Sequence, residues 1–244
     1  MSKITMVTSG KGGVGKSTVC AMLGTALAKS GEKVLIVELD VGLRCLDIIL
    51  GVSNRAVYDL SDVVSGRCSP RDAVVRCDAC DDLYVTVAPN DPSFDLNSQQ
   101  FNDFLKKLYD AFDFVFIDTP AGIGRQMESA ASLCDSALIV ATPDPVCVRD
   151  GGKTAEKLSK LGIKERRLII NRVNVDEPKK NSITDFDEIV DSIGVQLIGV
   201  IPDDKNAAIA LMQGEPVSQK SLFSMGFDNI AKRFAGIETS LLII

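Results

Sequence analysis

The chain has 244 residues, of which 45% are hydrophobic and 25% are charged, and its formal net charge is -6. This length and composition are typical of a soluble protein with one large globular domain, and the acidic balance argues against binding nucleic acid through the whole surface. Histidine is absent, which excludes Ser-His-Asp catalysis and zinc held by histidine.

Seven cysteines are scattered along the chain, and residues 1–7 read as the start of a strand rather than as a secretion signal. Scattered cysteines without such a signal indicate a reducing compartment. No apolar run approaches the roughly 20 residues of a membrane-spanning helix. The sequence therefore predicts a cytoplasmic protein that is not integral to the membrane.

Short apolar runs alternate with helix-compatible stretches along the chain. The predicted strands are residues 4–8, 34–39, 83–88, 114–117, 137–141, 168–173 and 197–201. The predicted helices are residues 16–29, 101–109, 152–160 and 185–191, and residues 52–80 are expected to hold small helices and turns. Because continuous aliphatic strands need burial on both faces, we predict a doubly wound, mostly parallel α/β sheet with helices on both faces. One domain is predicted over residues 1–236, followed by a short apolar tail, 237–244.

The segment between the first predicted strand and helix carries a phosphate-binding motif. It reads Gly10-Lys11-Gly12-Gly13-Val14-Gly15-Lys16-Ser17-Thr18 and fits the pattern G-x-x-x-x-G-K-[ST] without a mismatch. Glycines let successive backbone N–H groups point at phosphate oxygens, and the following helix N-terminus adds a positive dipole. Lys16 is predicted to bridge the β- and γ-phosphates of a nucleotide, and the Ser17 hydroxyl to ligate Mg²⁺.

Lys11, directly after the first glycine, is not required by an ordinary P-loop. The string from Lys11 to Thr18 resembles the deviant Walker A motif of the MinD/ParA family. The resemblance implies that Lys11 reaches across an ATP-dependent homodimer to the partner's nucleotide and, like an arginine finger, stabilises charge during hydrolysis.

Two acidic residues follow predicted strands. Asp118 ends an apolar strand, as a Walker B aspartate does, and Asp40 follows the second strand. Both would lie at the carboxyl edge of the sheet, where open α/β sheets bind ligands, so Ser17, Asp40 and Asp118 are the predicted metal-site residues. The string from Glu38 to Asp47 resembles the MinD switch I, which implies that Asp40 positions the hydrolytic water. MinD proteins usually have Asp where this chain has Glu38.

Further stretches resemble MinD proteins over approximately residues 2–236. The segment 118–123 resembles switch II, which implies that Gly122 swings an amide toward the γ-phosphate, and Val148-Arg149-Asp150 implies that Asp150 partners Lys11. The segments 54–60 and 214–217 also match. Two pairs resemble the adenine-recognition positions and favour ATP over GTP, since an Asn amide can donate to and accept from the edge of adenine: Asn171 with Arg172, and Pro202 with Asp203.

The C-terminal residues depart from this pattern. MinD proteins end in a basic amphipathic helix that lies on anionic membrane. Here Phe227, Ile230, Ala231 and Phe234 have helical spacing and are predicted to face the core, and no Lys or Arg follows Arg233. Either the sequence stops before an anchor helix or the anchor has degenerated. We expect at most weak, ATP-dependent attachment to the inner membrane surface.

The resemblance implies a slow, activator-stimulated ATPase with ATP and Mg²⁺ as cofactors. Its dimer would bind a MinC-like division inhibitor, a MinE-like activator would stimulate hydrolysis, and the process served would be placement of the division septum. Two alternatives stay open. An iron–sulfur carrier could use the C-x-x-C pair Cys77 and Cys80, and a family relative could instead position flagella or plasmids.

Overall fold

The computed structural model describes residues 3–41, 44–78, 80–89, 94, 99–174 and 185–242. Its strands are β1 (Lys3–Thr8), β2 (Val34–Glu38), β3 (Val75–Arg76), β4 (Leu83–Thr86), β5 (Phe114–Asp118), β6 (Ser136–Ala141), β7 (Glu165–Val173) and β8 (Leu197–Pro202). Its helices are α1 (Lys16–Lys29), α2 (Leu46–Ile49), α3 (Leu60–Val64), α4 (Gln99–Tyr109), α5 (Arg125–Ala131), α6 (Pro145–Lys160), α7 (Phe186–Ile193), α8 (Lys205–Met212) and α9 (Leu222–Phe234).

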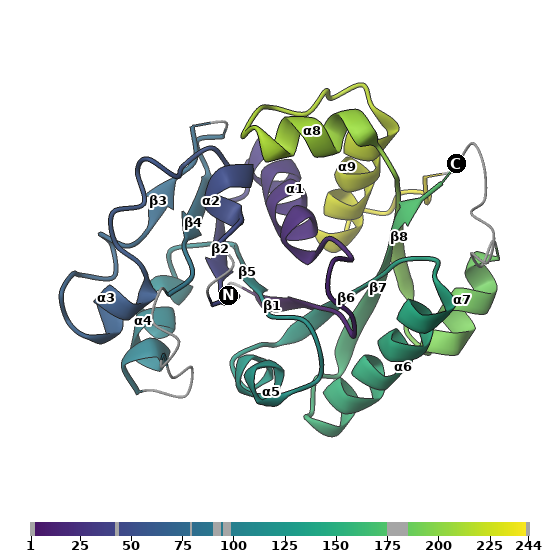
Figure 1. The fold of residues 1–244 in the computed structure, drawn as a ribbon, viewed down its shortest axis with the longest axis horizontal. Helices are drawn as coiled ribbons and strands as arrows, with labels where there is room; N and C mark the ends of the chain where they lie inside the picture. The colour runs from purple at the N-terminus through teal and green to yellow at the C-terminus, as the bar shows by residue number, and fades with distance from the viewer. Residues whose placement is uncertain are drawn as a thin grey trace.

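The strands of the described residues form one sheet in the order β3-β4-β2-β5-β1-β6-β7-β8. Every neighbouring pair is parallel except β3 with β4. Helices α1, α8 and α9 lie on one side of the sheet and α5, α6 and α7 on the other (Figure 1). All five residues of β2 are buried, as strands covered on both faces require. The predicted doubly wound α/β fold is confirmed.

Each predicted strand and helix is present, with differences at the ends. Helix α6 begins at Pro145, seven residues before the predicted start at 152, because the Asp144 side chain caps it and proline is favoured at the first helical position. Strand β3 and helices α2, α5 and α8 were not predicted. These elements span two to eight residues, so each contains few repeats of a hydrophobic pattern and the pattern is a weak signal there.

Helix α9 faces the core, as predicted from its apolar spacing. Phe227 and Ile230 are each 1% exposed, and the ring of Phe234 lies 5.6 Å from that of Phe114 and 5.5 Å from that of Phe116 in β5. The apolar face of this helix is therefore used in packing. In the described part of the chain, no helix combines the length and the apolar character needed to cross a bilayer.

The close approach of α9 to β8 at Gly199 gives a stability prediction. A Cβ atom on Gly199 would lie 2.2 Å from Cγ1 of the buried Ile230. We expect Gly199→Ala to lower the free energy of unfolding, measured in urea, by about 1–3 kcal/mol, because the helix or the isoleucine must shift. In an Ile230→Ala background the same change should cost much less. An equal cost in both backgrounds would contradict the steric explanation.

Candidate nucleotide site

The phosphate-binding loop lies between β1 and α1, and its glycines are needed for close approach. A Cβ on Gly10 would lie 2.5 Å from the carbonyl oxygen of Asp150, and one on Gly15 would lie 2.5 Å from Nδ2 of Asn171. Gly15 also has a φ of 96°, which disfavours other residues. Helix α1 starts there without a capping side chain and without an acidic residue in its first turn. Its first N–H groups and positive dipole end are therefore suited to phosphate.

Asp118 at the end of β5 is suited to a cation. Its side chain is fully buried, and neither carboxylate oxygen has a hydrogen-bond partner among the described residues, which is costly for a buried polar group. Burial raises the pKa of Asp118 to about 7, opposed by the neighbouring Ser17 hydroxyl and the Lys16 ammonium. Two unpartnered oxygens beside a serine hydroxyl fit a hard cation such as Mg²⁺, so the donor set fits the predicted metal.

Asp40 lies two residues beyond β2 and is partly buried. Burial raises the pKa of Asp40, and the charge of Lys16 opposes that shift. Lys16 itself is 7% exposed and also acts electrostatically on Asp118. The structure thus brings the predicted Lys16, Asp40 and Asp118 into one electrostatic environment at the carboxyl edge of the sheet.

Glu38 makes hydrogen bonds to backbone groups that could not be predicted from its position in the sequence. It is fully buried and pairs in register with Asp118. Its Oε1 accepts hydrogen bonds from the backbone N–H groups of Cys45 (2.9 Å) and Leu46 (3.1 Å), at the start of α2. Its Oε2 accepts the N–H of Ala88 at 3.2 Å. The longer side chain therefore links the end of β2 to the start of α2 and to the chain that follows β4.

The pairing of Lys11 differs from the expected one. Its ammonium lies 3.7 Å from Oδ1 of Asp144, with both side chains about half exposed. Asp150 instead contacts Arg149 at 3.2 Å and Lys153 at 3.5 Å. The reason is the length of α6, since Asp144 caps the helix beside the loop whereas Asp150 lies in its second turn with its backbone against Gly10. The role of Asp150 toward Lys11 in a dimer stays a prediction.

Gly122 also differs from the arrangement implied for it. Its N–H, expected to turn toward the γ-phosphate, donates a hydrogen bond of 3.0 Å to the carbonyl of Ser9. Its φ of 98° is a conformation that glycine adopts easily. A turn of this amide toward a phosphate would therefore require the bond to Ser9 to break.

The predicted adenine residues line one cavity. Its volume is about 340 Å³, and Asn171, Arg172, Pro202 and Asp203 contribute to its wall together with Thr18 of the P-loop. Asn171 donates one of its two Nδ2 hydrogens to the carbonyl of Val14 at 2.8 Å, and its side-chain oxygen is a group that can accept a hydrogen bond from the adenine amine. Arg172 has a φ of 57°, an unusual backbone conformation of the kind that clusters at functional sites.

The same cavity is lined by residues that were not predicted. They come mainly from the short helices α2 and α8 and from the start of α9: Cys45, Ile48, Ile49, Asp204, Ala208, Leu211, Met212 and Phe223. No local motif marks them, because they reach the cavity only when these helices pack over α1. Their largely apolar character suits the flat face of a base.

The C-x-x-C pair lies away from this site, beside β3. Cys77 is buried, and burial raises the pKa of its thiol to about 12, which disfavours the thiolate that binds metal. Among the described residues, neither Cys77 nor Cys80 belongs to a group of three or more metal-ligating side chains. The pair therefore gives the iron–sulfur alternative no further support.

The raised pKa of Asp118 predicts a pH dependence of stability. A carboxyl whose pKa is raised from its ordinary value of 3.8 to about 7 in the folded state destabilises the fold progressively as pH rises from about 4 to 7, because the folded state then binds more protons than the unfolded state. We expect Asp118→Asn to remove this dependence. Without nucleotide, the unfolding free energy of the variant minus that of the native chain should rise by up to roughly 1.4 kcal/mol per pH unit in that window. Urea unfolding tests this, and a constant difference would contradict it.

The sequence and the fold are similar to those of known proteins. The profile of the CobQ/CobB/MinD/ParA nucleotide binding domain matches residues 5–217. The chain is 38% identical over 249 residues to the septum site-determining protein MinD of Bacillus subtilis, covering 100% of this chain and 93% of that protein. Its fold matches MinD in the MinC:MinD cell division protein complex of Aquifex aeolicus (TM-score 0.91, 33% identity, 99% of both chains). It also matches septum site-determining MinD with Mg-ADP from Pyrococcus horikoshii (TM-score 0.85, 28% identity, 96% of both chains).

Proposed function

Because this chain belongs to the MinD group of the CobQ/CobB/MinD/ParA nucleotide-binding family, we propose that it is an ATP-hydrolysing switch that positions the division septum. It dimerises when it binds ATP, holds a division inhibitor in that state and releases it after hydrolysis. The Aquifex aeolicus complex contains MinC, so the partner proposed here is a MinC-like inhibitor. A MinE-like activator would accelerate hydrolysis.

The observation that carries this proposal is the position of Lys11. It lies on the P-loop with a side chain that is 49% exposed and a single weak ion pair, to Asp144, among the described residues. Exposed pairs of this kind contribute about 0–1 kcal/mol. Lys11 can therefore leave Asp144 at little cost and contact the phosphates of a second subunit.

The other site residues are assigned to the phosphates, the adenine base, the metal ion and the attacking water. We assign Lys16, the N–H groups of the P-loop and the start of α1 to the phosphates, and Asn171 and Arg172 to adenine. Ser17, Asp118 and Asp40 would hold Mg²⁺ directly or through water, and the bound ion would neutralise phosphate charge. Asp40 would orient the attacking water.

The proposal is tested by measuring mass and partner binding in each nucleotide state. With ATP and Mg²⁺ the chain should be a dimer by light scattering, and it should retain the MinC-like protein encoded in the same genome. With ADP it should be a monomer that does not retain it. A monomer in both states would contradict the switch, whereas an ATP-dependent dimer that ignores the inhibitor would favour positioning of another cargo.

We further propose that helix α9 by itself attaches the chain only weakly to membranes. Its apolar residues Phe227 and Ile230 are each 1% exposed, so they pack in the core and are not available to enter a bilayer. Dimerisation joins two such helices and raises avidity, but from a small starting affinity. In sedimentation with anionic liposomes, little protein should pellet with either ATP or ADP. Strong ATP-dependent sedimentation would show that the tail is an effective anchor.

A further inference from the structure

Glu38 and Arg44, which lie before and after Asp40 in the chain, are both hydrogen-bonded to the backbone of one residue, Ala88. On the side before Asp40, Glu38 accepts the N–H of Ala88 at 3.2 Å. On the side after it, Arg44 donates its Nε hydrogen to the carbonyl of the same Ala88 at 3.0 Å. Ala88 is fully buried and follows β4, the strand next to β2. The backbone N–H and C=O of one buried residue thus hold Glu38 and Arg44, two residues before and four residues after Asp40.

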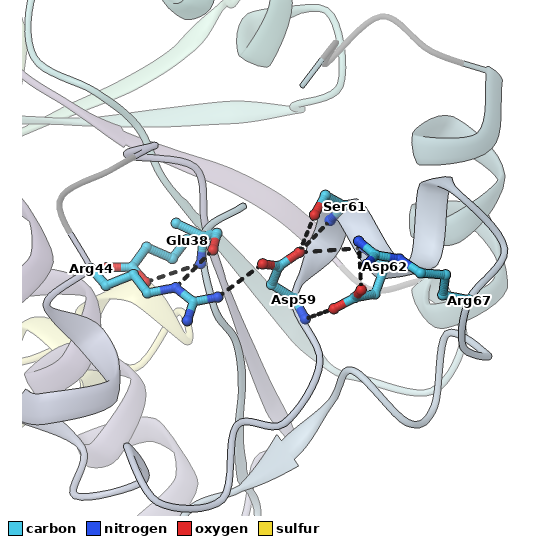
Figure 2. Close-up of polar contacts among 7 residues, drawn as sticks. Glu38, Arg44, Asp59, Ser61, Asp62 and Arg67 are labelled. Carbon is cyan, nitrogen blue, oxygen red and sulfur yellow. Dashed lines mark hydrogen bonds and ion pairs between the residues drawn. The ribbon is translucent and has the colours of Figure 1, made fainter. Parts of the chain in front are cut away.

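Arg44 extends this arrangement to helix α3. Its Nη2 donates to Oδ2 of Asp59 at 3.1 Å, and Figure 2 shows the Arg44 guanidinium directed at Asp59. Asp59 is 5% exposed, and its other oxygen accepts the backbone N–H groups of Ser61 (2.7 Å) and Asp62 (3.3 Å) as the N-cap of α3. The carboxylate that orients Arg44 is therefore itself fixed by the start of a helix.

We propose that Arg44 is a positioning residue for ATP hydrolysis: its bond to Ala88 keeps Asp40 in its place relative to the sheet. Asp59 of α3 sets the orientation of the Arg44 side chain. The inference rests on the role proposed above for Asp40. A planar guanidinium that donates to two fixed acceptors has little rotational freedom. The position of the Arg44 backbone, four residues after Asp40, is therefore restricted as well. A catalytic group that is misplaced by about 1 Å can lower the rate by a large factor. The position of Asp40 therefore affects the hydrolysis step more than it affects nucleotide affinity.

The test compares variants at the two ends of the ion pair. We expect Arg44→Ala and Asp59→Asn each to lower kcat for ATP about tenfold, with KM and the affinity for ADP within about twofold of the native values. Asn at 59 keeps an oxygen that can cap α3. Because both residues act through one contact, the double variant should be no slower than Arg44→Ala alone. Arg44→Lys, which retains the charge but not the fork, should recover part of the rate.

A matched control removes another ion pair from the same helix. Arg67 lies 2.8 Å from Asp62 in α3 and is 65% exposed, and Figure 2 shows it on the far side of Asp59 from Arg44. Arg67→Ala should leave kcat unchanged. The proposal is overturned if Arg44→Ala lowers thermal stability without lowering kcat, if the two single effects add, or if KM rises as much as kcat falls. An inactive native chain would count against the proposed function instead, and it would be seen before any variant is made.

Discussion

Lys16→Ala is expected to weaken ATP and ADP binding by roughly 100-fold or more. Charge-assisted hydrogen bonds to a phosphate contribute about 1.5–3 kcal/mol, and each 1.4 kcal/mol is a factor of ten in affinity. Lys16 is 7% exposed and its positive charge acts on two carboxylates, Asp40 and Asp118. Its removal therefore also leaves these carboxylates without a neighbouring cation beside an anionic ligand. Isothermal titration with ADP and Mg²⁺ measures the change.

Lys11→Ala is the matched comparison, since it removes a second lysine from the same loop. Lys11 is half exposed and pairs with Asp144, whereas Lys16 acts on Asp40 and Asp118. Its loss should leave ADP affinity within a few fold of the native value, while ATP-dependent dimerisation and hydrolysis are lost. The two lysines would share one role, contrary to our assignment, if both variants lost nucleotide affinity to the same extent.

Asp40→Ala is expected to separate binding from hydrolysis. The variant should bind ATP and form the dimer but hydrolyse roughly 100-fold more slowly, because a residue that positions or deprotonates the nucleophile contributes about that factor. Single-turnover measurements with ATP, together with light scattering, distinguish the two steps. Asp40→Asn, which keeps the shape and loses the charge, should behave similarly.

A different outcome would assign Asp40 another role. If Asp40→Ala stays monomeric with ATP, the residue holds the dimer together rather than orienting water. If the variant fails to bind nucleotide, then Asp40, although it is partly exposed, contributes to nucleotide binding through its electrostatic effect on Asp118.

The sequence by itself determined the fold class and the location of the phosphate site. A P-loop is a local motif, since its glycines, lysine and serine act within one turn and the helix that follows it. The aspartates Asp40 and Asp118 could be predicted to meet because each follows a buried strand, and parallel strands end at one edge of the sheet. These inferences need only the chain order and the alternation of strands and helices.

The tertiary structure alone decided the contacts between residues distant in the chain. The sheet order places β2 beside both β4 and β5, and this is why Glu38 reaches Ala88 on one side and lies beside Asp118 on the other. The bond from Asn171 to Val14 and the pairing of Lys11 with Asp144 instead of Asp150 depend likewise on which elements pack together. Side-chain partners across 44 or 157 positions of the chain leave no periodic trace in the sequence, because they are selected by the packing of whole strands and helices and not by local propensity.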